Sequence, residues 1–411
     1  MIALDLSRLL SRAGRGTPTG IDRVELAYAE HLMRNGSDAV FAAVSTLGTL
    51  GLLPETEAQR FVTRIGAVWR AGGADENEEK QLKQLARRLR MAPLAGGERS
   101  FHKRLRATRH RPVYLLVSHH HLEKRRIFER LKSRASARFV CLIHDLIPIE
   151  YPEYAKPGQA DNHRRRIETA AEFADAVIVN SRVTRDSLQP YIDRTGRRTG
   201  VLVAPFGVDL PGSEAASNTD EGPLGRPYFA YVSTIEARKN HLLLLNVWRR
   251  LGQEFGDDAP RLVLIGQRGW ETENVVDMLE RCPALRGLVI EHNALADSEM
   301  VPLIKGARAM LLPSFAEGFG FPLIEALGFG VPVLCSDIPA LRETGGGVPE
   351  YLDPLDGPGW REAILDYAAP LSPRRDAQLL RLAQWQPARW DDHFAMVGEL
   401  LAETAAAQAA E

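Results

Sequence analysis

Two glutamates and the turn between them are the residues of this sequence whose types and spacing best suit a chemical site. Seven residues separate Glu317 from Glu325, and the turn Gly318-Phe319-Gly320 lies between them. Pro322 suits the first turn of a helix, where a missing N–H costs nothing. A helix that begins near Pro322 directs the amides of residues 318–320 and its positive dipole end toward a bound anion or hydroxyl group. The two carboxylates then reach opposite ends of one bound molecule.

Arg238 and Lys239 form a second chemical feature, an adjacent basic pair after the apolar run Tyr228–Val232. A guanidinium binds two oxygens of an anion such as phosphate at once, and an ammonium supplies a point charge, so the pair suits a bound anion. Taken alone, both features have simpler explanations: an ordinary turn with a solvated glutamate, and a solvated basic pair after a strand. Only the wider pattern of the chain decides between these readings.

The elements that must position these residues are short apolar runs that alternate with helical patterns, which is typical of a parallel α/β sheet. Polar or glycine residues follow the strands at the end where open α/β sheets bind ligands, among them Thr234 and Gly266. The predicted strands are Ile2–Leu6, Val113–Val117, Phe139–Ile143, Ala176–Val179, Val201–Ala204, Tyr228–Val232, Arg261–Ile265, Leu288–Glu291, Ala309–Leu312 and Val331–Cys335.

The chain length of 411 residues fits two or more domains. A polar, glycine-containing stretch predicts a linker over 211–225. We therefore expect one domain over 1–210 and a second over 226–388. Residues 389–411 are predicted to form a terminal helix that packs against one of the two domains, with the first domain as the candidate. A basic insertion is expected at about 75–112.

Several segments together resemble the retaining glycosyltransferases of family 4, which have the GT-B fold. Glu317 and Glu325 match the family's Glu-x7-Glu signature, and residues 231–240 match its segment after the first strand of the second domain. There, Ala237 stands where the family has proline and Ser233 where it usually has glycine. The likeness extends to residues 174–181, 205–209, 330–333, 336–337 and 353–356. It implies two Rossmann-like domains whose parallel sheets face a central cleft.

The resemblance also implies roles for the first features. Arg238 and Lys239 would bind the diphosphate of a nucleotide sugar, and Glu325 the ribose hydroxyls. Glu317 and the amides of 318–320 would hold the transferred sugar, with Thr234 and Gly266 among the donor-binding residues. Whether Glu317 acts as a nucleophile or only stabilises the positive charge of the transition state stays open.

The first domain offers two candidate sites. His144 follows a predicted strand and resembles the family's histidine that faces the donor sugar. A single histidine at a strand end is often merely hydrogen-bonded, but its place at a carboxyl end favours a catalytic role. Gly20 ends a loop, residues 14–20, that resembles the family's glycine-bearing loop near the donor phosphates and acceptor. Its glycine spacing does not fit a dinucleotide fingerprint.

Charge is unevenly distributed although 52 Lys and Arg nearly balance 53 Asp and Glu. Residues 81–138 hold 17 basic and three acidic residues, and 81–90 has the pattern of an amphipathic basic helix. This segment is either a solvated insertion or a surface for an anionic membrane or lipid-linked acceptor. The latter surface would include Lys103, Arg104, Arg106 and Arg109. Nucleic acid is a poor fit, because no stacking platform accompanies the charge.

Other functional classes find little support. No Walker-type loop and no Asp-x-Asp pair occurs, so we expect neither a P-loop nucleotidase nor a metal-dependent transferase, and no metal or cofactor. The run His119-His120-His121 lacks partners at metal-ligand spacing, and we expect His119 and His120 to line the acceptor side instead. Three scattered cysteines and no secretion signal predict a cytoplasmic protein, either free or peripheral on the inner face of the plasma membrane.

These features together predict a metal-independent retaining glycosyltransferase. It would move mannose, glucose or a similar sugar from a GDP- or UDP-linked donor to a polysaccharide or lipid-linked oligosaccharide. One alternative is a nucleotide-sugar epimerase of the same fold, which would release an epimer with no acceptor present. The other is a catalytically silent binding subunit, against which the intact set of Glu317, Glu325, Arg238 and Lys239 speaks.

Overall fold

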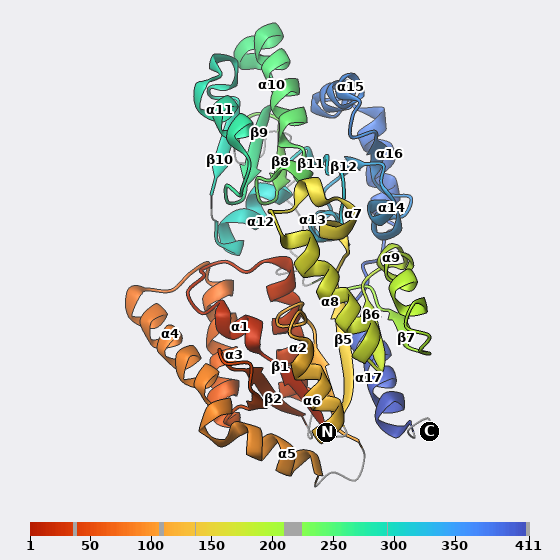
Figure 1. Cartoon of the computed structure of the whole chain (residues 1–411). Coiled ribbons are helices and arrows are strands. Elements are labelled where there is room, and N and C mark those ends of the chain that lie inside the picture. The colour runs from red at the N-terminus through yellow and green to blue at the C-terminus, as the bar shows by residue number, and fades with distance from the viewer. Residues whose placement is uncertain (36–38, 107–110, 136, 209–223, 294, 408–411) are drawn as a thin grey trace. The chain divides into compact units, whose positions relative to one another are not determined.

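The structure, a computed structural model, describes all residues except 36–38, 107–110, 136, 209–223, 294 and 408–411. The described chain forms two compact units, shown in Figure 1. Unit 1 contains residues 1–206 and 391–411, and unit 2 contains residues 207–390. The predicted linker at 211–225 lies almost entirely outside the described residues.

Unit 1 is built on a seven-stranded sheet with the order β3-β2-β1-β4-β5-β6-β7. All neighbouring strands are parallel except β2 and β3, which pair as an antiparallel hairpin at the sheet edge. The strands are β1 (Ile2–Asp5), β2 (Ala39–Val44), β3 (Leu50–Leu52), β4 (Val113–Leu116), β5 (Arg138–Ile143), β6 (Ala176–Val179) and β7 (Gly200–Val203). The helices are α1 (Ser7–Ser11), α2 (Gly20–Asn35), α3 (Glu55–Arg70), α4 (Glu76–Met91), α5 (Glu98–Arg106), α6 (Arg125–Ala135), α7 (Ile147–Glu150), α8 (Gln159–Phe173), α9 (Arg182–Asp193) and α17 (Trp390–Ala406).

The hairpin corrects the expectation of a wholly parallel sheet in the first domain. Strands β2 and β3 lie within one apolar stretch that the sequence pattern does not divide into two strands. A short turn at residues 45–49 reverses the chain there, and the Ser45 N–H donates to Thr49 O at 2.8 Å. An antiparallel pair needs only such a short turn, so no intervening helix marks the two strands in the sequence.

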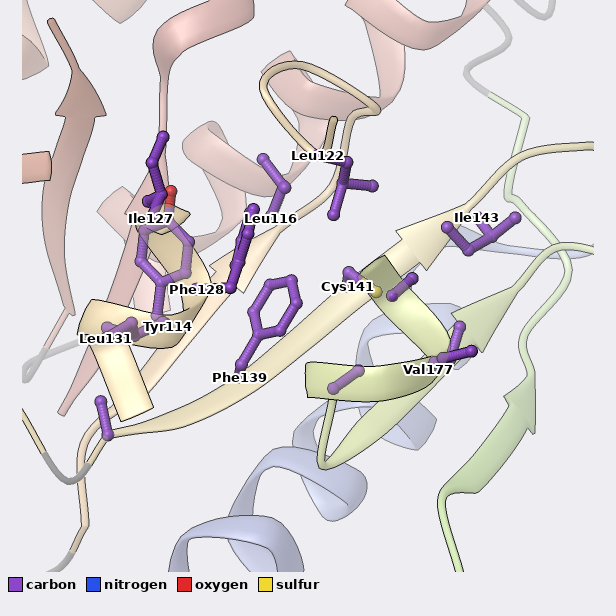
Figure 2. Packing of buried hydrophobic residues seen from close by; sticks show 14 of the residues in the cluster. Tyr114, Leu116, Leu122, Ile127, Phe128, Leu131, Phe139, Cys141, Ile143 and Val177 are labelled. Carbon is purple, nitrogen blue, oxygen red and sulfur yellow. The ribbon is translucent and has the colours of Figure 1, made fainter. Parts of the chain in front are cut away.

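The core of unit 1 packs between the central strands and the helices that cover them. Figure 2 shows Tyr114 and Leu116 of β4 beside Phe139 and Cys141 of β5, with Phe128 of α6 against them. Phe128 and Phe139 have ring centroids 4.6 Å apart. Because helices cover both faces, these strands are apolar at nearly every position, which is why the sequence marks them clearly.

Helix α17 packs on unit 1, although it follows unit 2 in the sequence. The Tyr28 hydroxyl of α2 lies 2.7 Å from His393 Nε2, and the rings of Tyr28 and Phe394 meet edge to face at 5.1 Å. His393 Nδ1 lies 3.2 Å from Ala204 O, just after β7. A carbonyl only accepts, so Nδ1 carries the proton and Nε2 accepts from Tyr28.

Unit 2 is a six-stranded parallel sheet with the order β10-β9-β8-β11-β12-β13. Its strands are β8 (Tyr228–Val232), β9 (Arg261–Ile265), β10 (Val289–His292), β11 (Ala309–Leu312), β12 (Val333–Ser336) and β13 (Glu350–Leu352). Its helices are α10 (His241–Phe255), α11 (Glu273–Arg281), α12 (Asp297–Lys305), α13 (Phe321–Gly328), α14 (Pro339–Gly345), α15 (Gly357–Ala368) and α16 (Pro373–Leu382). Trp248 and Trp360 are fully buried in its core. Both units are therefore Rossmann-like α/β layers.

The strands predicted from the sequence are present to within about two residues at each end. The strand expected at 331–335 begins two residues later, at Val333. Strand β13 escapes prediction because it is three residues long and only partly buried at the sheet edge. Within the described part of the chain, no helix is long and apolar enough to cross a membrane.

Candidate functional site

In unit 2, the predicted donor residues meet where the strand order of the sheet reverses. Strands β8 and β11 are neighbours, and the chain runs outward from them in opposite directions. Arg238 and Lys239 follow β8, and Glu317 follows β11. A parallel sheet binds its ligands outside the carboxyl ends of its strands at such a switch point. The sheet order therefore brings together side chains 78 positions apart in the sequence.

Four charged side chains form a nearly buried cluster at this point. Lys239 Nζ lies 2.6 Å from Glu317 Oε1, and Arg238 Nη1 lies 3.1 Å from Glu317 Oε2. Arg238 Nη2 lies 2.6 Å from Glu236 Oε1. Only 7–17% of each side chain is exposed. Sequence reasoning gave Glu236 no role. Its position two residues before Arg238 is the signal that could have identified it.

The cluster keeps Glu317 ionised. Burial alone would raise the pKa of this carboxyl, but Lys239 and Arg238 beside it lower the pKa to about 2. Burial lowers the pKa of Lys239 below its ordinary value, and Glu317 opposes that effect. Glu317 therefore has no proton to donate at neutral pH and acts as an anion.

Backbone contacts fix the loop that carries the two cations. Asn240 Nδ2 donates to Pro313 O at 3.1 Å and to Pro354 O at 2.9 Å. The Tyr231 hydroxyl donates to Lys239 O at 2.6 Å, and Phe315 N–H donates to Arg238 O at 2.9 Å. The loops after β8 and β11 thus hold each other in place, and the cations stay positioned without a ligand.

The helix predicted to begin near Pro322 is α13, which begins at Phe321. Its N-cap, Gly320, has φ 85°, and a Cβ there would lie 2.6 Å from Leu341 Cδ2. The positive φ therefore favours glycine at this position, and any larger residue would also have to displace the Leu341 side chain. Glu317 precedes the helix, and Glu325 lies within it, partly exposed.

Gly266 and Thr234 lie at the ends of two neighbouring strands, β9 and β8. A Cβ on Gly266, at φ 154°, would lie only 1.9 Å from Ser233 O, so the glycine permits close approach of the two loops. Thr234 is exposed. Their contact with a donor stays a prediction.

In unit 1, the histidines meet beyond the carboxyl ends of β4 and β5, next to the corresponding switch point between β1 and β4. The His119 ring lies 5.3 Å from that of His144 and 4.9 Å from that of His163, centroid to centroid. His119 Nε2 accepts from the His144 backbone N–H at 3.1 Å. His144 O accepts from Asn180 Nδ2 at 2.9 Å, and His163 Nε2 lies 3.0 Å from Asp145 O. His163 is thus a missed member of the site, and it comes from the middle of a helix, where no local signal marks it.

These contacts fix the protonation of His144. Its Nε2 lies 2.9 Å from Val117 O, which only accepts, so Nε2 carries the proton and Nδ1 is an acceptor. Burial lowers the pKa of His144 to about 4. It also lowers the pKa of His120 to about 3 and holds that of His119 well below its usual range. All three are neutral at pH 7, so His144 is suited to accept a hydrogen bond from a hydroxyl.

The glycine-bearing loop of unit 1 ends at a buried carboxylate that the sequence analysis missed. Asp22 Oδ1 accepts from Arg8 Nε at 2.6 Å, and Asp22 Oδ2 accepts from the Thr19 N–H at 2.9 Å. Gly20 is the first residue of α2. The positive charge of Arg8 contributes to the low pKa of His144, so this loop lies near the histidines.

The structure does not bring the basic segment to this site. Lys103 and Arg104 are exposed on α5, which precedes β4, whereas His119 and His120 follow β4. Figure 1 shows α5 beside the N-terminus, where β1 begins, and α1 toward the other end of unit 1. Residues that precede a strand of a parallel sheet lie at the amino ends of its strands, and residues that follow it lie at the carboxyl ends. The Arg106 side chain and all of Arg109 lie outside the described residues.

The predicted basic amphipathic helix is the central part of α4. Its apolar side chains, Leu82, Leu85 and Leu89, are buried, and α4 packs against α3 and α1. This apolar face is used within unit 1, and the side chains that the helix exposes to solvent are mainly polar, among them the cations Arg87 and Arg90. Among the described residues, no group of three or more His, Cys, Asp or Glu is arranged to hold a metal ion.

Comparison with known proteins identifies the family. The family model of glycosyl transferases group 1 matches residues 214–345. The chain is 34% identical over 259 residues to O-antigen chain mannosyltransferase B of Escherichia coli, a match that covers 62% of this chain and 68% of that protein. The chain belongs to the group 1 glycosyl transferases. The predicted family is thereby confirmed.

Other matches of this chain are more partial. It is 29% identical to the serotype-specific mannosyltransferase WbdA of Escherichia coli, over 51% of this chain and 27% of that protein. The chain thus spans about a quarter of the length of that relative.

Sucrose-phosphate synthase from Thermosynechococcus elongatus has a similar structure, with a TM-score of 0.64 and 16% identity over 98% of both chains. This likeness shows the fold, and the predicted GT-B class is confirmed.

Proposed function

We propose that this glycosyltransferase moves a hexose from a nucleoside-diphosphate donor to a saccharide acceptor with retention at the anomeric carbon and without a metal. The observation that carries the proposal is the cluster of Arg238, Lys239 and Glu317 at the switch point of unit 2. The names of relatives such as O-antigen chain mannosyltransferase B support mannose as the sugar and a polysaccharide or lipid-linked oligosaccharide as the acceptor. The donor base is guanine or uracil.

In this proposal, the two cations act on the leaving group. As the bond from the anomeric carbon to the diphosphate breaks, negative charge grows on the phosphate oxygens. Lys239 and Arg238 lie on a loop whose backbone is fixed by hydrogen bonds, so the loop itself does not have to reorganise to place them against that charge. The dipole of α13, which begins just after Gly320, adds to the same field. Glu325 binds the ribose hydroxyls.

On the sugar side, Glu317 is an anion that stabilises the positive charge of an oxocarbenium-like transition state. Neutral His144 accepts a hydrogen bond from a sugar hydroxyl through Nδ1. His119 and His120 line the acceptor side. The basic residues of α5, which include Lys103 and Arg104, stay a candidate surface for an anionic membrane, consistent with a cytoplasmic, peripheral enzyme.

The test is a panel of GDP- and UDP-linked sugars, read by thermal shift and by nucleotide release, with Glu325→Ala and Lys239→Ala alongside. We expect one donor to stabilise the wild type, and both variants to bind it at least about tenfold more weakly. NMR of the product identifies its anomer. Release of an epimer without acceptor would indicate an epimerase instead, and binding without turnover would indicate a silent subunit.

A further inference from the structure

The four charged side chains that form the cluster of unit 2 balance one another. Arg238 and Lys239 supply two positive charges, and Glu236 and Glu317 supply two negative ones, all within ion-pair distance. Glu317 contacts both cations, whereas the Glu236 carboxylate contacts Arg238 alone among the ion pairs of the described residues. Glu236 is therefore the one member of the cluster to which the proposed function gives no role.

A nucleoside diphosphate brings at least two further negative charges to the same place. If its phosphates approach Arg238, they come close to a carboxylate that already lies 2.6 Å from Nη2. Both Nη atoms of Arg238 are engaged, Nη1 by Ala316 O and Glu317 and Nη2 by Glu236. The side chain of Glu236 is only 10% exposed, so water screens this repulsion weakly.

The contact between Glu236 and Arg238 also stabilises the protein itself. Without Glu236, the guanidinium would share a single carboxylate with Lys239 in a largely buried place, and an uncompensated buried charge is costly. Glu236 thus neutralises Arg238 and accepts from it, and it helps to hold the guanidinium beside the loop after β11.

We propose that Glu236 is an internal counter-anion that competes with the donor diphosphate for Arg238 and promotes release of the nucleoside diphosphate after transfer. The proposal rests on the proposed function, because it assumes that Arg238 binds the diphosphate. Glu236 is a positioning residue: it touches Arg238, not the reacting atoms. As the product leaves, the carboxylate reforms its ion pair with the guanidinium.

The test compares binding of UDP, GDP and inorganic pyrophosphate to the wild type and to Glu236→Gln. Glutamine keeps the shape and the acceptor oxygen but removes the charge. We expect it to bind the diphosphates about tenfold more tightly, mainly through a slower off-rate measured by stopped flow. Glu236→Ala, which also loses the hold on Arg238, is expected to gain less.

Two further variants calibrate the result. Lys239→Ala is expected to weaken diphosphate binding, as the proposed function requires. Glu350→Gln is the matched control, because Glu350 also forms a part-buried ion pair, with Arg374 at 2.8 Å. Glu350 lies at the amino end of β13, whereas the cluster lies at the carboxyl ends of its strands. It is expected to leave binding unchanged.

Each outcome is decisive. If the wild type binds none of the three probes, the proposed function fails and the inference falls with it. If the wild type binds and Lys239→Ala weakens binding, but Glu236→Gln binds equally or more weakly, the donor site stands and the inference is overturned. Should Glu236→Gln fail to fold by circular dichroism, Glu236→Asp replaces it; the shorter acid is expected to bind more tightly than the wild type, and equal or weaker binding overturns the inference.

Discussion

Glu317 Oε1 lies 2.6 Å from Lys239 Nζ, and both side chains are largely excluded from water. In such a place the charge of each is tolerated because of the other, and the backbone bonds around Arg238 keep the geometry fixed. The chemistry available at this site follows: an anion and two cations held ready before any ligand arrives. Glu317 contributes to stability as well as to the proposed catalysis.

That contribution depends on pH in a definite direction. The pKa of Glu317 falls from 4.5 to about 2 on folding because of Lys239 and Arg238, against the effect of burial. The stabilisation is fully present above pH 4.5 and is lost as pH falls toward 2. We expect Glu317→Gln to be less stable than the wild type by about 3 kcal/mol at pH 7, since it leaves Lys239 unpaired.

Urea unfolding of both proteins between pH 7 and pH 3 measures this. The difference in unfolding free energy should stay constant down to about pH 5 and shrink below it. A difference that is unchanged at pH 3 would mean that the pKa of Glu317 is not lowered by its partners.

At the scale of elements, the position of the helix start at α13 depends on the backbone conformation of one residue, Gly320. Gly320 holds φ 85°, and a methyl group there would have to displace the end of the Leu341 side chain. We expect Gly320→Ala to destabilise unit 2 by about 1–3 kcal/mol and to weaken diphosphate binding, because the helix start must shift.

Urea unfolding and pyrophosphate binding test this expectation. Gly398→Ala is the control, because Gly398 lies within α17 and a Cβ there meets nothing within 4 Å. This control should gain up to about 1 kcal/mol, since alanine is the better helix former. Equal effects of the two substitutions would contradict the special role of Gly320.

At the scale of the whole molecule, the chain leaves unit 1 after Phe206 and returns to it at Asp391. Unit 1 is therefore complete only when the residues of α17 have been made. Phe394, Val397 and Leu401 of α17 are buried in it. We expect Leu401→Ala to destabilise unit 1 by about 2–5 kcal/mol through loss of burial and the cavity that remains.

Hydrogen exchange read by mass spectrometry locates the effect. Faster exchange should appear in the peptides of α2 and β7, and peptides of unit 2 should exchange as in the wild type. Leu380→Ala serves as control, because Leu380 is a helix leucine of α16 that is 71% exposed, and it should change stability by less than about 0.5 kcal/mol. Faster exchange confined to unit 2 would contradict the assignment of α17.

The sequence by itself determined the features that are local. Apolar runs marked the buried parallel strands, Pro322 and the glycines marked the start of α13, and the signature of Glu317 and Glu325 marked the family. Each of these signals lies within a few residues of the structure it specifies.

Only the tertiary structure decided which distant residues meet. The order of strands β8 and β11 pairs Lys239 with Glu317, and helix packing brings His163 to His119. The direction of β4 separates Lys103 from His119, because Lys103 precedes this strand and His119 follows it. The physical reason is that charge pairing and burial depend on distances in space, which the sheet order fixes and the spacing along the chain does not.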